Sequence, residues 1–234
     1  MNKHLFVSAT KGNGEDTAFK RWTSLVNLNG VENIEFKQFI NNTKGLSQLY
    51  NEIIEKNKSK FDYIHFIHDD AFVYDNINYV IKEIEDSDYD ISGVAGTGAI
   101  VIGYPSGWYD LALKSGKYNM IAGHIEHKHM GTGLSQELIF GNQRFNSKAV
   151  VVDGVYMCVR MKNIGDWKFN EHYTFHHYDI ASCIDAVRKG LKVGVVNLHL
   201  RHELQPKPLT IVDPVWIESD KIFRQEYGEQ TLIW

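Results

Sequence analysis

The stretch "FIHDDAFVYD", residues 66–75, places two adjacent carboxylates, Asp69 and Asp70, directly after an apolar run. Such a run is typical of a buried strand, and two like charges this close repel each other more strongly where water is scarce. Water, a basic partner or a bound cation must compensate for that repulsion. An isolated pair of aspartates is most often a solvated turn, but the strongly apolar strand before it and the adjoining His68 favour a ligand site here.

The segments around this stretch alternate between strand-like and helix-like patterns. Apolar residues at helical spacing predict helices that begin near Leu46, capped by Asn42 or Thr43, and near Ile77, capped by Asp75. Strands are predicted at 4–9, 34–40, 62–67, 90–96, 99–104, 149–161 and 191–203. Strand and helix in alternation predict an α/β domain with a parallel sheet covered on both faces, whose ligands bind beyond the carboxyl ends of the strands.

Composition narrows the class of protein. The chain has 234 residues, 43% hydrophobic and 23% charged, which is ordinary for one soluble domain. A net charge of −4 makes nucleic acid an unlikely partner. Cys158 and Cys183 lie in apolar stretches and are expected as free core residues in a reducing compartment. No signal peptide and no apolar run of about 20 residues is visible, so we expect a cytoplasmic protein without a membrane span.

The middle of the chain, about 116–146, is polar, and we expect a loop or a lid over a site. Its "HIEHKH" holds His124, His127 and His129, which could suggest zinc. The spacing lacks the usual cluster of partner ligands, so a flexible polar loop is the prediction, with a candidate lid at 124–133.

Two further sets of residues could carry chemistry. Asp179 lies at the start of a predicted amphipathic helix, where it is either a helix cap or a general base that takes a proton from an acceptor hydroxyl. His199 and His202 follow a predicted strand, and either could be a packed residue or a further ligand of a carboxylate-bound Mn²⁺ or Mg²⁺.

Four segments in order carry a resemblance: "GLSQLYNEIIEKNKSKFDYIHFIHDD", "VVDGVYMCVRM", "KFNEHYTFHHYDIASCIDAVRKGLKVGVV" and "HLRHE". Taken together, these segments resemble family-2-like glycosyltransferases of the GT-A fold, in the branch with HDD in place of DxD. The resemblance covers about 5–202. It implies a single GT-A-type domain with a Rossmann-like, mostly parallel sheet flanked by helices. Residues 1–100 would form the nucleotide-binding half, 101–204 the acceptor and catalytic half, and 205–234 a tail along the surface.

The resemblance also implies a reaction and a set of site residues. The expected reaction is inverting transfer of a sugar from a UDP- or GDP-sugar to an acceptor hydroxyl, with a divalent metal, Mn²⁺ or Mg²⁺. Asp179 matches the catalytic base. Asp70 and His202 match the metal ligands, with His199 as the alternative. Donor contacts are implied for Ser8, Thr10, Asn41, Asn42, Asn51, His68, Asp69, Asp153 and Gly154.

The sequence departs from the family pattern at three points. His68 replaces the first acid of DxD, Asn41 and Asn42 stand where many relatives have Asp, and "HHY" precedes Asp179 without a Glu. Two other functions stay open. A nucleotidyltransferase would need a basic glycine-rich loop after the first strand, where "TKGNGED" offers one Lys and two acids. A non-catalytic glycan-binding module would bind glycan without turning over a donor.

Overall fold

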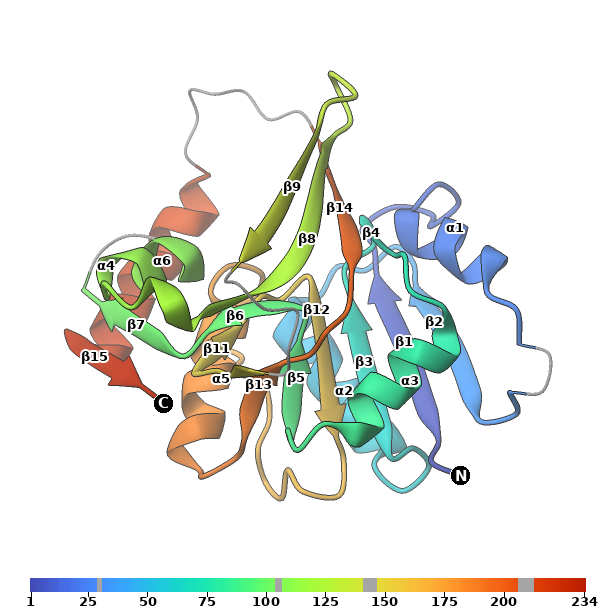
Figure 1. The fold of residues 1–234 in the computed structure, drawn as a ribbon, viewed down its shortest axis with the longest axis horizontal. Coiled ribbons are helices and arrows are strands. Elements are labelled where there is room, and N and C mark those ends of the chain that lie inside the picture. The colour runs from blue at the N-terminus through green and yellow to red at the C-terminus, as the bar shows by residue number, and fades with distance from the viewer. Residues whose placement is uncertain (29–30, 104–106, 141–146, 206–212) are drawn as a thin grey trace.

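The computed structural model describes residues 1–28, 31–103, 107–140, 147–205 and 213–234. Its main sheet has seven strands in the order β10-β13-β5-β12-β3-β1-β2 (Figure 1). Their bounds are β1 His4–Ala9, β2 Ile34–Phe39, β3 Tyr63–Ile67, β5 Ile91–Gly93, β10 Ser147–Lys148, β12 Tyr156–Arg160 and β13 Val193–Val195.

The main sheet is mixed. Strand β1 is parallel to β2 and β3, and β13 is parallel to β5, whereas β12 and β10 are antiparallel to their neighbours. Most of the strands therefore run in one direction, as predicted, but the sheet is not purely parallel. The chain enters β12 by a tight turn from the short strand β11 (Val151–Val152), which pairs antiparallel with β6 of the second sheet.

Six α-helices are present among the described residues: α1 Ala18–Leu25, α2 Leu46–Asn57, α3 Ile77–Asp86, α4 Trp108–Lys114, α5 Tyr178–Arg188 and α6 Pro214–Tyr227. The predicted caps are wrong by one to three residues. Gly45 precedes α2 without a side-chain cap, and the cap of α3 is Asn76, whose side chain accepts from Tyr79 N. The Asp75 carboxylate accepts instead from His199 N at 2.6 Å, so it ties α3 to the chain before β14.

A second sheet occupies the region where a loop was predicted. Its order is β11-β6-β8-β14-β4, with β9 paired to β8, and its further bounds are β4 Ala71–Val73, β6 Ala95–Thr97, β8 Ile121–His129, β9 Ser135–Phe140 and β14 Leu200–Leu204. Strands β8 and β9 form a hairpin that projects from the body of the molecule (Figure 1). The loop prediction for 116–146 is therefore wrong over this hairpin, while 141–146 lie outside the described residues. The strands were missed because their side chains are polar. Strand β8 pairs with β6 and β14 on one side and with β9 on the other, through backbone hydrogen bonds that do not require apolar side chains.

The described part of the C-terminal tail, residues 213–234, forms a helix and a strand. Pro214 opens α6, and β15 (Gln230–Ile233) pairs antiparallel with β7 (Ala99–Ile102), on the left of Figure 1. Pro206 and Pro208 lie outside the described residues. Cys158 and Cys183 are buried free thiols, as expected. Within the described ranges, every helix is too short or too polar to cross a membrane.

Gly123 of β8 lies opposite Ala95 of β6 in the antiparallel pairing of these strands. Its φ is +128°, and an added Cβ would lie 2.4 Å from Ala95 Cα and from Val94 O. We expect Gly123→Ala to lower the free energy of unfolding by at least about 2 kcal/mol, since strain and a backbone clash add. Urea unfolding measures this. The control is Gly12→Ala, whose Cβ would meet only Thr10 Oγ1 at 3.9 Å, and equal stability of the two variants would contradict the prediction.

Candidate functional site

The HDD stretch is a tight turn that joins the two large sheets. Strand β3 of the main sheet ends at Ile67, and β4 of the second sheet begins at Ala71. His68 N donates to Val155 O at 3.0 Å, and Glu203 N donates to Asp70 O at 2.8 Å. The turn is thus held by the residue that precedes β12 on one side and by β14 on the other.

Asp70 lies between two imidazoles. Its Oδ1 is 3.3 Å from His202 Nε2 and 4.0 Å from His68 Nδ1, and the three side chains could together offer ligands to one metal ion. This Oδ1 atom is buried and receives no hydrogen bond of ordinary geometry from the described residues. Burial alone would raise the pKa of Asp70, but the neighbouring histidines, His202 above all, lower it overall. The carboxylate is therefore ionised and suited to a cation.

Tyr178 fixes the tautomer of His68. The Tyr178 hydroxyl donates its one proton to Gly154 O at 2.8 Å, and His68 Nε2 lies 3.0 Å from the same hydroxyl, so Nε2 must be the donor there. Burial lowers the pKa of His68, and a neutral ring with a proton on Nε2 presents a lone pair on Nδ1. That lone pair faces the Asp70 carboxylate, an arrangement that repels unless a cation lies between them.

Asp179 occupies the first turn of α5 and is held by backbone amides. Gly154 N donates to Oδ2 at 2.8 Å, and Ile180 N donates to Oδ1 at 2.9 Å. Burial first, and then the charge of Asp153, raises the pKa of Asp179 to about 7, against the pull of these amides. A carboxylate with a pKa near neutrality can accept a proton at physiological pH.

Asp153 and Gly154 lie directly beside Asp179. Asp153 accepts from Trp108 Nε1 at 2.7 Å and from Val155 N at 2.8 Å, so both of its oxygens are held in place. A Cβ at residue 154 would lie 2.4 Å from Tyr178 Oη, so only glycine permits the approach of Tyr178 that orients His68.

Two adjoining cavities surround these groups. A cavity of about 190 Å³ includes His68, Asp153, Gly154 and Asp179 in its lining. A larger cavity of about 610 Å³ has Thr10, Asn42 and Asp69 in its lining. Phe175 and His176 line both, so the two cavities are neighbours.

Other predicted site residues lie apart from the two cavities. Ser8 is fully buried in β1, and Asn41, with φ +50°, is exposed beside the larger cavity without lining it. The side-chain amide of Asn51 bonds to Phe169 N and Phe169 O, so it braces the segment before α5. His199 lies in a separate cluster of potential ligands from Asp70, whereas His202 lies beside Asp70.

Several lining residues were missed by the sequence reasoning. In the larger cavity they are Lys11, Thr43, Lys44, Thr174 and Val215, the last from α6. In the smaller cavity they are Trp108, Tyr178 and Trp216, the last also from α6. Phe175 lines both cavities. Tyr178 could have been noticed as the neighbour of Asp179. Nothing local marks the aromatic residues, because their place in the site depends on how α4 and α6 cover it.

The fold is that of the GT-A-like α/β glycosyltransferases. The crystal structure of A197 from STIV is similar to this chain, with a TM-score of 0.50 and 8% sequence identity. The match covers 90% of this chain and 98% of A197. The S. aureus TarS 1-349 structure in complex with UDP-GlcNAc has a TM-score of 0.50 at 11% identity, over 97% of this chain and 67% of TarS 1-349. At these identities the likeness concerns the fold alone.

The sequence itself establishes the family. The model of the glycosyltransferase-like family matches residues 14–230, and this chain belongs to that family. The chain is therefore a glycosyltransferase, as the sequence resemblance implied. No curated protein matches it in sequence.

The raised pKa of Asp179 has a consequence for stability. The folded pKa of about 7 exceeds the ordinary value of 3.8, so the folded protein binds more protons than the unfolded chain between these values, and stability falls as pH rises through the window. Asp179→Asn removes this penalty, each pKa unit of which corresponds to about 1.4 kcal/mol. We expect the variant to gain stability relative to the wild type between pH 4 and pH 8, measured by urea unfolding at both values.

The matched control is Asp166→Asn. Asp166 is exposed, and its hydrogen bond from Lys189 lowers its pKa, so its neutralisation should shift relative stability weakly and in the opposite direction. A parallel pH dependence for the two variants would contradict the burial of Asp179.

Proposed function

We propose that this chain transfers a sugar from a nucleoside-diphosphate sugar, UDP- or GDP-linked, to an acceptor hydroxyl with inversion at the anomeric carbon. The observation that carries the proposal is the placement of two differently tuned carboxylates. Asp70 is kept ionised between His68 and His202, and Asp179, with its pKa near 7, lines the cavity that His68 also lines. Such a division suits one acid to a cation and the other to a proton.

The metal ligands that the geometry favours are Asp70, His202 and His68. The buried Oδ1 without a hydrogen bond and the Nδ1 lone pair directed at it fit a divalent cation, Mn²⁺ in preference to Mg²⁺ because two of the three ligands are imidazoles. A cation held there would neutralise the charge that develops on the departing diphosphate.

The larger cavity is the proposed place for the nucleoside. Its volume of about 610 Å³ is in the range of small-molecule sites, and its lining combines amide, hydroxyl and lysine side chains with the ring of Phe175. Asp69 belongs to this lining, next to Asp70 in sequence, and this supports the contacts that the sequence resemblance implies between the donor and Thr10, Asn42 and Asp69.

The smaller cavity is the proposed place for the transferred sugar and the acceptor. Trp108, Phe175 and Trp216 line it, and aromatic faces pack well against the C–H face of a sugar ring. In the proposed step, the acceptor oxygen forms a bond to the anomeric carbon and the bond to the diphosphate breaks with its electron pair. The acceptor proton passes to the Asp179 carboxylate, each of whose oxygens receives one backbone amide and retains a lone pair.

The metal requirement of donor binding tests the first half of the proposal. We expect UDP or GDP to bind in titration calorimetry with Mn²⁺ and to lose at least about tenfold in affinity with chelator, because charge neutralisation is lost. Asp70→Asn should abolish the effect of Mn²⁺. His129→Ala, a histidine change at the exposed end of β8, is the control. Absence of nucleotide binding with any divalent metal would overturn the proposal.

The general base is tested by turnover. Asp179→Asn should reduce kcat about 10²–10⁴-fold while leaving nucleotide affinity within a few-fold, since Asn fills the same space but cannot take the proton. In the wild type, kcat/KM should rise with pH and level off above about 7, where Asp179 is ionised. Hydrolysis or transfer of a UDP-sugar at full rate by Asp179→Asn would exclude this role. Release of pyrophosphate from a nucleoside triphosphate would favour a nucleotidyltransferase instead.

A further inference from the structure

A second cluster of potential metal ligands lies in the β8–β9 hairpin and the segment before β14. It comprises His124 of β8, Glu137 of β9 and His199, and their ligand atoms all lie within 4.8 Å of one another. His124 Nε2 is 2.6 Å from Glu137 Oε1, and His199 Nε2 is 4.0 Å from the same oxygen. We call these three residues the hairpin cluster.

The two imidazoles of the hairpin cluster are stacked. Their centroids are 3.7 Å apart with an interplanar angle of 3°, and His199 directly precedes Leu200, the residue of β14 that pairs with Ile125 of β8. His199 Nε2 is buried and has no hydrogen-bond partner among the described residues. A buried polar atom without a hydrogen bond is destabilising, so packing alone gives no reason to place a histidine there.

We propose that the hairpin cluster binds a transition-metal ion, Zn²⁺, at a site separate from the donor site. Two imidazoles and one carboxylate are a common zinc ligand set, and imidazole favours zinc over Mg²⁺ and Mn²⁺. Ligand atoms around tetrahedral zinc are spaced about 3.4 Å apart, given bonds of about 2.1 Å. The nitrogens of His124 and His199 lie 2.6 and 4.0 Å from Glu137 Oε1, and metal binding requires the two stacked rings to turn out of their parallel arrangement so that both lone pairs point at one ion.

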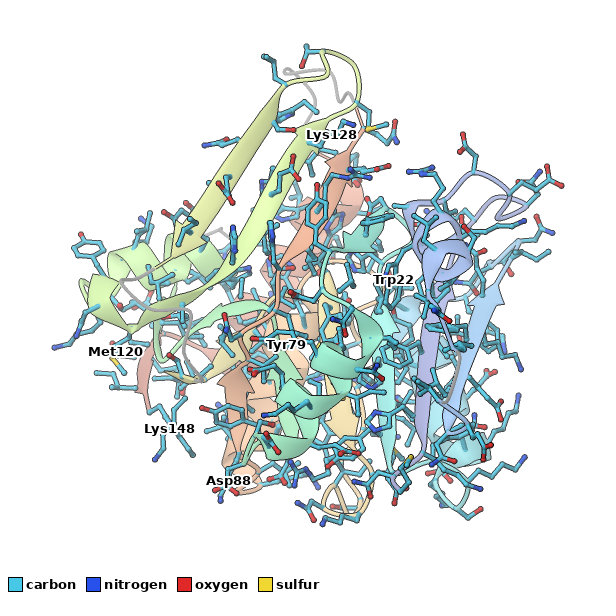
Figure 2. All side chains as sticks on the ribbon, turned by 45° about the vertical axis from the view of Figure 1, so that its right-hand side comes forward. Trp22, Tyr79, Asp88, Met120, Lys128 and Lys148 are labelled. Atoms are coloured by element: carbon cyan, nitrogen blue, oxygen red, sulfur yellow. The ribbon has the colours of Figure 1, made fainter. Side chains whose placement is uncertain are left out.

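An open position for a fourth ligand exists beside the cluster. His124 and His199 line a cavity of about 190 Å³ together with Asp75, Tyr79 and Asn197. This cavity has space and polar partners for a bound water. Figure 2 shows Tyr79 in the body of the molecule and Lys128 toward the outer end of β8, so the cavity lies at the inner part of the hairpin.

The hairpin cluster is distinct from the Asp70 site. His199 and His202 are three residues apart, which corresponds to about 10 Å along an extended chain and directs their side chains to opposite faces. The ring contacts agree, because His199 stacks on His124 whereas His202 contacts His127 and His68. None of the three cluster residues lines either proposed substrate cavity.

The experiment measures Zn²⁺ alone, in the full chain with the first site removed. In an Asp70→Asn/His202→Ala background, equilibrium dialysis with metal analysis should give about one Zn²⁺ per chain. Adding His199→Phe, which keeps an aromatic ring against His124 but removes the ligand nitrogen, should abolish that binding. Glu137→Gln should weaken it more than about a hundredfold, because loss of even an indirect partner of a metal ligand costs about 10–100-fold.

A matched control and a spectroscopic readout complete the test. His129→Ala in the same background removes a histidine from the exposed end of β8 and should leave Zn²⁺ binding unchanged. Co²⁺ in place of Zn²⁺ should give visible absorption typical of four-coordinate cobalt, lost with His199→Phe. Circular dichroism without metal confirms that each variant is folded. A background protein that binds no Zn²⁺, or binding that survives His199→Phe, would overturn the proposal, and neither result depends on sugar transfer.

Discussion

The contact between Asp70 and its two histidines is the interaction on which the site depends. It joins parts of the chain that are far apart in sequence, and it exists because the HDD turn leaves the main sheet at β3 and enters the second sheet at β4, beside β14. The backbone bond from Glu203 N to Asp70 O sets β14 against the turn. Through Tyr178, the same arrangement extends to Gly154, whose amide holds Asp179. The residues proposed to hold a cation and the residue proposed to act as base are therefore positioned by one connected set of contacts.

The environment shifts the pKa values of the two acids in opposite directions. Both Asp70 and Asp179 are removed from bulk water, which by itself raises a carboxyl pKa. At Asp70 the neighbouring histidines outweigh burial, whereas at Asp179 the nearby negative charge of Asp153 adds to it. Backbone amides alone do not reverse the effect at Asp179. The difference between the two pKa values thus comes from the side chains that the fold places around each acid. His202 and Asp153 are far in sequence from the acids they act on, so the sequence around each acid does not reveal this difference.

Much of the main sheet could be predicted from the sequence because local patterns specify it. The strand at His4–Ala9 agrees to the residue, and the start of the helix at Leu46 and the acidic turn after β3 were also found. The caps were less predictable, since Asn42 and Asp75 are good capping residues that the fold uses elsewhere: Asn42 bonds to Lys44, and Asp75 to His199. The aromatic wall of the smaller cavity could not be predicted, because Trp108 and Trp216 reach it from helices far apart in the chain.

The histidines of β8 and β14 show why register, and not spacing, decides which residues act together. From the sequence, His202 was the favoured ligand beside Asp70 with His199 as the alternative, and "HIEHKH" lacked partners for zinc. Pairing β14 parallel to β8 sets His202 opposite His127 and brings His199, the residue before β14, to His124, so these two histidines go to different clusters. The antiparallel return of β9 then supplies Glu137 to the second cluster. A set of ligands spread over three segments is invisible to any local motif, since each segment contributes a single atom and only the sheet assembles them.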